Sequence, residues 1–277
     1  MLNVVGFAAV HNLHTYPFIS RQFINVLMGT QVLGVGPDNV AAFIGEPIMG
    51  AAGVIIPPST YWPEVQRICR KYGILIISDE VICGFGRTGK WFGFETLGFE
   101  PDIINMAKGL SSGYQPIGAV AFSNKLTIPF FDKGGDFNHG MTYAGHPVAA
   151  AVALKNIEIL QSEKLVERVA ELGPCFNKML QGLIDHPIVG EVRSIGLIGA
   201  IELTKNKATR ARFDKLGRVG TICRDHCINN GLIMRACNDT MVLAPPFCIS
   251  KTEIDEIGKL ARLALDKTHA DVKSELA

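Results

Sequence analysis

The chain has 277 residues, with 27 Lys and Arg against 26 Asp and Glu and a net charge of +1. This balance argues against nucleic acid as a partner, and seven cysteines without a Cys-x-x-Cys motif predict neither a zinc knuckle nor a disulfide framework. No apolar stretch reaches the roughly 20 residues that cross a bilayer, and no basic segment opens a signal peptide. We therefore expect a cytoplasmic globular protein that contacts neither nucleic acid nor membrane.

The first part of the chain alternates short apolar runs with one amphipathic segment. Residues 1–28 show no clear period. A helix that lies between two buried strands forms a βαβ unit, which requires a parallel sheet. The elements predicted here are strands over 40–44, 74–78, 103–107 and 117–122, and helices over 58–72 and 148–161.

The second part mixes helices and strands without that alternation, which is typical of an α+β module. Its predicted elements are a helix over 165–183, strands over 189–192 and 197–203, a helix over 216–229, a strand over 241–243 and a last helix from residue 252. We therefore predict two domains, residues 1–163 and 164–277.

Two of the buried strands end in a single charged residue. The run before Asp79 and the run before Lys108 are both apolar and β-branched. Carboxyl ends of parallel strands meet at the crevice where open α/β sheets bind ligands. An Asp and a Lys in one crevice suit pyridoxal phosphate (PLP), whose aldehyde forms a Schiff base with lysine and whose ring nitrogen needs an anion. The alternatives are a lysine that closes a surface strand and an aspartate that caps a helix.

Three motifs carry a family resemblance. They are Glu46-Pro47, the segment from Asp79-Glu80-Val81 to Gly89, and Ala107-Lys108-Gly109-Leu110. Together they resemble the class III aminotransferases of PLP fold type I, and within them the ω-amine:pyruvate and putrescine:pyruvate transaminases. The likeness extends from about Gly29 to near Leu265, and residues 1–28 match nothing in that family.

The resemblance implies an α/β fold. Residues 1–163 would be the C-terminal part of the large PLP-binding domain, with a mixed or parallel sheet, and 164–277 the small α+β domain. It also implies that Lys108 is the catalytic Schiff-base lysine and Asp79 the partner of the ring nitrogen. Val81 would pack on the ring, and Thr142 would reach the cofactor phosphate of a neighbouring subunit. We expect Glu80 to be structural.

The substrate residues implied by the resemblance are Arg235, which would bind a substrate carboxylate as a planar fork, and Glu46, its resting partner. The expected reaction moves an amino group from a primary amine or ω-amino acid, such as putrescine, to pyruvate or another keto acid. The expected assembly is a homodimer with shared active sites. His11, His14, His139 and His146 lack metal-ligand spacing, so no metal site is predicted.

Family members are longer, and the Gly-Ser loop that cradles the phosphate would precede this chain. We therefore expect a C-terminal fragment that binds PLP weakly and has little activity alone. Two alternatives stay open. One is an aminomutase on the same fold, against which Arg235 argues because that reaction needs no alternating carboxylate site. The other is a non-catalytic remnant.

Overall fold

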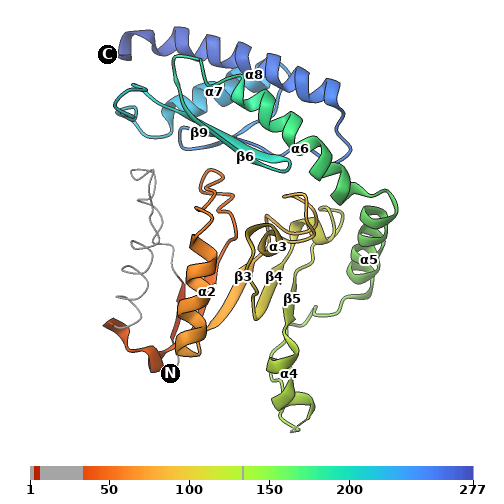
Figure 1. The fold of residues 1–277 in the computed structure, drawn as a ribbon. Helices are drawn as coiled ribbons and strands as arrows, with labels where there is room; N and C mark the ends of the chain where they lie inside the picture. The colour runs from red at the N-terminus through yellow and green to blue at the C-terminus, as the bar shows by residue number, and fades with distance from the viewer. Residues whose placement is uncertain (1–2, 7–33, 133, 277) are drawn as a thin grey trace. The chain divides into compact units, whose positions relative to one another are not determined.

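The computed structural model describes residues 3–6, 34–132 and 134–276 (Figure 1). These residues form two compact units. Unit 1 consists of the chain up to Ile48, Pro57–Gly86 and Lys90–Lys164. Unit 2 takes up the chain from Leu165 onward together with two short segments, Met49–Ile56 and Arg87–Gly89.

Unit 1 contains a five-stranded sheet in the order β1-β2-β3-β4-β5. The first four strands are parallel and β5 is antiparallel to β4. The predicted βαβ arrangement is confirmed, because α2 connects the neighbouring parallel strands β2 and β3. The elements are β1 (Asn3–Gly6), η2 (Pro37–Asn39), β2 (Val40–Gly45), α2 (Tyr61–Tyr72), β3 (Leu75–Asp79), α3 (Gly93–Leu97), β4 (Ile103–Met106), η3 (Lys108–Leu110), β5 (Ala119–Phe122), α4 (Asn124–Phe131) and α5 (Pro147–Ser162).

Helix α2 follows from its apolar stripe. Val65, Ile68 and Cys69 are buried as predicted, and they join the core cluster of unit 1 together with Trp62. The helix ends at Gly73, which has a φ of +66° and donates its amide to the last turn. The predicted start at residue 58 is wrong, because the helix begins at Tyr61.

A buried carboxylate ties the start of β4 to the rest of unit 1. Asp102 accepts the Ile76 amide at 2.8 Å and two hydrogen bonds of 2.9 Å from Arg70, and it pairs with Lys125. Burial opposes ionisation of this carboxyl, but the hydrogen bonds outweigh it and hold its pKa below the usual range. This charge network aligns β3 with β4 at the amino-terminal end of β4.

Other elements of unit 1 depart from the prediction. The strand expected over 117–122 is confined to Ala119–Phe122 and runs antiparallel. The short helices α3 and α4 were not predicted, and neither was β1, which falls in the first 28 residues. The remaining residues of that stretch lie outside the described part of the chain.

Unit 2 is built on a four-stranded antiparallel sheet in the order β6-β7-β9-β8. Apart from the short strand β8, its elements correspond to the predicted α+β pattern, and the last helix carries a capping box between Ser250 and Glu253. They are α6 (Leu165–Gln181), β6 (Val189–Ile195), β7 (Ile198–Leu203), α7 (Arg218–Asn229), β8 (Arg235–Cys237), β9 (Thr240–Leu243), α8 (Lys251–Val272) and η4 (Lys273–Glu275).

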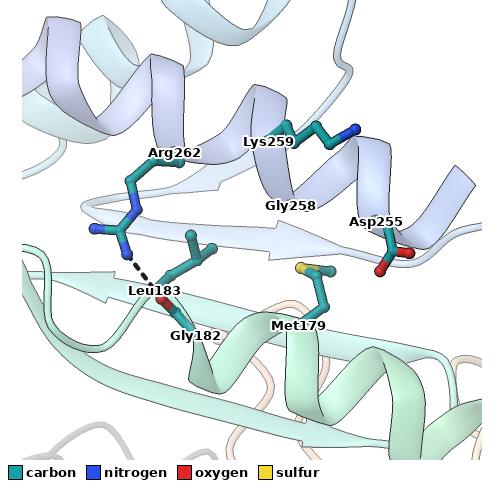
Figure 2. A pocket seen from close by; sticks show the side chains of 7 residues that line it. All are labelled: Met179, Gly182, Leu183, Asp255, Gly258, Lys259 and Arg262. Carbon is teal, nitrogen blue, oxygen red and sulfur yellow. Dashed lines mark hydrogen bonds between the residues drawn. The ribbon is translucent and has the colours of Figure 1, made fainter. Parts of the chain in front are cut away.

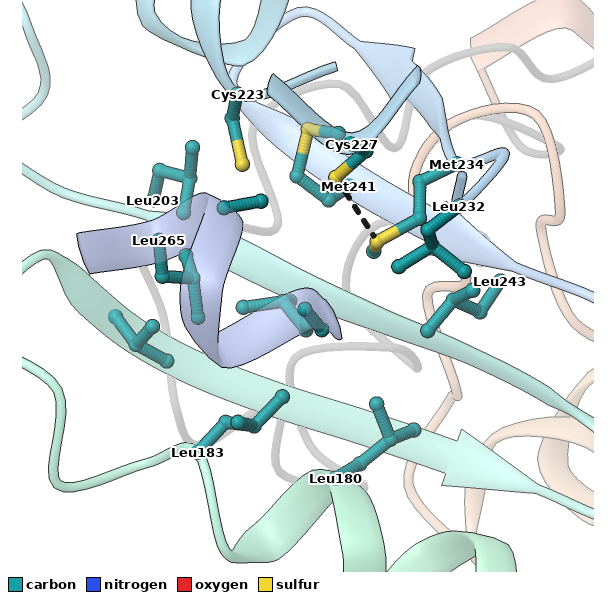
Figure 3. Close-up of a cluster of buried hydrophobic side chains, with 14 of the residues drawn as sticks. Leu180, Leu183, Leu203, Cys223, Cys227, Leu232, Met234, Met241, Leu243 and Leu265 are labelled. Carbon is teal, nitrogen blue, oxygen red and sulfur yellow. Dashed lines mark hydrogen bonds between the residues drawn. The ribbon is translucent and has the colours of Figure 1, made fainter. Parts of the chain in front are cut away.

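The core of unit 2 is a continuous apolar cluster between its sheet and its helices (Figure 3). Phe176 and Leu180 from α6, Ile201 from β7 and Leu265 from α8 are at most 1 % exposed. Two thiols of α7 join them, and Cys227 donates to the sulfur of Met234 at 3.6 Å. These thiols fill space in the core as apolar groups do. No described helix combines the length and the apolar character that crossing a membrane would require.

Candidate active site

Asp79 is the last residue of β3 and is half-buried. It lies opposite Asn105 of β4, and the following amide, that of Glu80, donates to the Asn105 carbonyl at 2.9 Å. Its Oδ1 atom accepts the Val81 amide at 3.1 Å, and Oδ2 has no partner among the described residues. Asp79 therefore presents a free acceptor at the carboxyl end of the parallel strands, where α/β sheets bind ligands.

Lys108 opens the turn η3, two residues after β4 ends. Its φ is +39°, a left-handed conformation that residues with a Cβ atom rarely adopt and that costs free energy. Its side chain is exposed, and within the described residues its Nζ atom forms neither a hydrogen bond nor an ion pair. The amine is thus accessible to a ligand at this edge of the sheet.

The turn of Lys108 packs closely against the loop that follows β3. A Cβ atom on Gly109 would come within 3.0 Å of the Phe85 Cβ and 3.3 Å of the Gly84 carbonyl oxygen. A larger residue at 109 would therefore have to push the Phe85 side chain or the Gly84 carbonyl aside by a few tenths of an ångström. The structure therefore brings the strand end of Asp79 and the turn of Lys108 to the same edge of adjacent parallel strands.

The buried Glu80 has the structural role expected for it. Its carboxylate accepts the Gly93 amide at 2.8 Å, the Phe94 amide at 2.9 Å and the Ser78 hydroxyl at 3.0 Å. Burial raises the pKa of this carboxyl, against the effect of those three donors. Glu80 holds the start of α3 beside β3 and so fixes the chain next to Asp79.

Asn156 of α5 was not predicted from the sequence. Its Nδ2 atom donates to the carbonyls of Gly109 at 2.9 Å and Leu110 at 3.1 Å, and its Oδ1 atom accepts the Ser112 hydroxyl at 2.7 Å. Its partners lie more than 40 residues away in the sequence and are mainly backbone atoms, so no sequence pattern marks it. It satisfies the carbonyls of the turn that begins at Lys108.

The other predicted residues of unit 1 lie in loops. Val81 follows β3 in a turn, and its predicted contact with the cofactor ring stays a prediction. Glu46 is half-buried just after β2. Burial, then the charge of Glu80 and, to a lesser degree, that of Glu46 raise the pKa of the Cys83 thiol to about 12. Thr142 is exposed on the loop before α5.

Arg235 belongs to unit 2. It is the exposed first residue of β8 and pairs with Val242 of β9. Beyond β9, Arg87 donates to the carbonyls of Leu197 at 2.9 Å and Pro245 at 2.7 Å. Pro245 lies just past the last paired residue of β9 and has no amide hydrogen to donate, and the Arg87 guanidinium supplies a donor to the carbonyls at this end of the sheet. The pairing of Arg235 with Glu46 stays a prediction.

A groove of about 540 Å³ lies between α6 and α8 in unit 2 (Figure 2). Met179 and Leu183 line it, and Arg262, also in its lining, donates to the Gly182 carbonyl at 2.7 Å. It contains none of the predicted site residues. Elsewhere, within the described residues, no three His, Cys, Asp or Glu side chains gather in a metal-binding arrangement, and His146 serves instead as the N-cap of α5.

The sheet of unit 1, with an acid and a lysine at the carboxyl ends of adjacent parallel strands, defines an α/β protein with a strand-end site. Comparison with known proteins then identifies the family. A family model described as aminotransferase class-III matches residues 19–264, starting ahead of the expected Gly29. The chain belongs to the class III aminotransferase family.

Individual relatives agree with this assignment. The chain is 56 % identical over 243 residues to a putrescine–pyruvate aminotransferase of Pseudomonas aeruginosa, covering 87 % of this chain and 53 % of the relative. It is 44 % identical over 245 residues to a mitochondrial gamma aminobutyrate transaminase of Solanum lycopersicum, covering 87 % of this chain and 48 % of that protein. The chain therefore spans about half the length of the curated relatives it matches.

Solved structures confirm the predicted fold type. The crystal structure of the omega transaminase from Pseudomonas jessenii in complex with PMP superposes with a TM-score of 0.89 at 42 % identity. That match covers 95 % of this chain and 60 % of the other.

Proposed function

We propose that the chain is part of a PLP-dependent transaminase that moves an amino group from a primary amine or ω-amino acid to pyruvate or a similar keto acid. Family membership supports the reaction class, and the names of the putrescine–pyruvate and gamma aminobutyrate relatives support amines of this kind. The observation that carries the proposal is the placement of Asp79 and Lys108 at the ends of the paired strands β3 and β4.

The residues at this edge fit the cofactor. PMP, the aminated form of PLP, is bound in the P. jessenii relative. Here Asp79 offers an oxygen without a partner among the described residues, and Lys108 offers an exposed amine. An anion and a primary amine are the two groups that a protonated pyridine ring and an aldehyde require. When bound, PLP supplies the aldehyde and an electron-accepting ring.

The chain's residues would divide the work. The Asp79 carboxylate would hold the proton on the ring nitrogen. The Lys108 Nζ atom would hold the cofactor at rest and, once the substrate has displaced it, move the proton at the amine-bearing carbon. Glu80 would keep the chain beside Asp79 in place. Val81 would lie on the ring, and Thr142 would donate its hydroxyl to the phosphate in a homodimer with shared sites.

Arg235 would bind the keto-acid carboxylate as a bidentate fork. Glu46 would pair with the Arg235 guanidinium when the amine substrate lacks a carboxylate. We also propose that residues 1–163 act as the cofactor-binding part and 164–277 as the small domain.

Reductive labelling tests the proposal. The chain is incubated with PLP, treated with borohydride and mapped by peptide mass spectrometry. We expect Lys108 to be labelled ahead of the exposed Lys90, and labelling at 108 to disappear in Lys108→Ala while Lys90→Ala keeps it. Equal labelling of Lys90 and Lys108 would contradict the proposal. Formation of alanine from pyruvate then separates a transaminase from an aminomutase.

A further inference from the structure

The turn that carries Lys108 is held in an unfavourable conformation. Lys108 has a φ of +39° and Ser112, four residues later, a φ of +50°, although both carry a Cβ atom. Left-handed backbone at such residues costs free energy and persists only where the surroundings impose it. Something next to the turn must therefore hold it in this shape.

Asn156 has the contacts to do so. As a short 3-10 turn ends, its last carbonyls lack backbone donors. The carboxamide of Asn156 supplies both missing hydrogen bonds, to Gly109 and Leu110, at 2.9 and 3.1 Å. Its oxygen takes the Ser112 hydroxyl at 2.7 Å. One side chain thus ties the two residues after Lys108 to Ser112, the second left-handed residue of the segment.

The position of Asn156 is itself fixed. It lies in the middle of α5, whose first residue is Pro147 and whose start is capped by His146. Ala153 and Leu160 of the same helix are buried. A half-buried amide on a packed helix has little freedom, and its two donors and one acceptor are all used.

We propose that Asn156 is a positioning residue for Lys108. By fixing the carbonyls that follow the lysine, it keeps the left-handed φ and so sets the direction in which the flexible lysine stem leaves the backbone. Without it the turn relaxes toward negative φ, and the amine points elsewhere. This inference rests on the proposed function, because it assigns Asn156 a role only if Lys108 reacts with the cofactor.

The test uses Asn156→Asp, Asn156→Leu and a matched control. Asp keeps the shape and the acceptor for Ser112 but removes both donors. Glu158→Gln, on the same helix and exposed, touches neither the turn nor its carbonyls. Each chain is titrated with PLP and reduced with borohydride, and labelling at Lys108 is measured relative to the exposed Lys90. The visible absorbance band of the loaded chain and the thermal midpoint are recorded in parallel.

We expect the Lys108-to-Lys90 labelling ratio to fall about tenfold in both Asn156 variants. The visible band should change, and Glu158→Gln should match the unsubstituted chain. If Asn156 contributes only to stability, its variants lower the thermal midpoint and leave the Lys108-to-Lys90 labelling ratio of the folded protein unchanged. That result overturns the inference. If the Asn156 variants do not fold, Ser112→Ala decides: a ratio two- to threefold lower supports the inference, and an unchanged ratio overturns it.

Failure of the proposed function gives a different result. If Lys108 is not labelled ahead of Lys90 in the unsubstituted chain, the proposed function and this inference both fall. If Lys108 is labelled there and equally in Asn156→Leu, only the inference falls.

Discussion

The two units are stabilised by different kinds of contact. Unit 2 buries one continuous apolar cluster from its sheet and all three of its α-helices. The largest cluster of unit 1 is smaller and centres on Trp62, and most of the exposed large apolar side chains among the described residues belong to this unit. Around its strand ends, unit 1 relies instead on single polar side chains, namely Glu80, Asp102 and Asn156. Cavities should therefore damage unit 2 most, and lost polar contacts should damage unit 1 most.

The largest effect is expected from a cavity in unit 2. Phe176 is fully buried, so Phe176→Ala should cost about 3–5 kcal/mol of the free energy of unfolding. Both tryptophans, Trp62 and Trp91, lie in unit 1, so their fluorescence reports that unit while circular dichroism reports both. In urea titrations the loss should appear mainly in the dichroism.

The matched control is Phe131→Ala, because that ring is 82 % exposed and its loss should change little. An equal shift of both signals in Phe176→Ala would show that the two units unfold together, and would refute the difference in stabilisation between them.

Next in size is the buried carboxylate of unit 1. Glu80→Gln keeps the shape but places an NH₂ group where one of three donors now points, at a cost of about 1–3 kcal/mol. Tryptophan fluorescence should follow the loss in urea titrations. Glu158→Gln, on the surface, is the control, and equal stability of the two variants would refute the anchor role of Glu80.

Much of this fold follows from sequence patterns. The apolar runs before Asp79 and Lys108 predict β3 and β4, and the stripe of Val65, Ile68 and Cys69 predicts α2. These patterns succeed because burial on a sheet or on one helix face selects residue types directly. The same logic places an acid and an amine at neighbouring strand ends.

Other features leave no such pattern. Helix α4 contains Pro129 and buries none of its residues, so its sequence lacks the buried apolar stripe that predicts a helix. Helix α3 is short, and its amides depend on Glu80, 13 residues earlier. The role of Asn156 likewise depends on carbonyls distant in the sequence, and a backbone carbonyl is the same in every residue type. Contacts made through the backbone must be read from the fold.

A smaller effect is expected at the end of the unit 2 sheet. Arg87→Met removes the donor shared by Leu197 and Pro245 and should cost about 1–2 kcal/mol. The loss should appear in circular dichroism under urea. Arg224→Met is the control, because Arg224 contacts its exposed neighbour Asp225. A loss no larger than the control's would show that the β7–β9 end needs no side-chain donor.

The smallest expected effects are losses of stability on acidification, which should set in at different pH values in the two units. Burial lowers the pKa of His186 in unit 2, so the folded state binds fewer protons there than the unfolded state, and stability falls as pH drops below 6.5. The pKa of Asp102 in unit 1 is also lowered, against burial and by its hydrogen bonds, so its contribution is present above pH 3.8 and is lost below it.

Thermal midpoints from pH 7 to pH 3 should therefore fall first in dichroism and later in tryptophan fluorescence. His186→Gln should flatten the first phase and leave the second unchanged. The opposite order of the two phases would contradict the assignment.

The central claim is that one PLP ring touches both Asp79 and Lys108. A crystal structure of the chain after PLP loading and borohydride reduction tests it most directly. We predict a covalent link at the Lys108 Nζ atom and an Asp79 oxygen about 2.7–2.9 Å from the ring nitrogen. A ring attached to another lysine, or held at Lys108 with its nitrogen away from Asp79, would contradict the account.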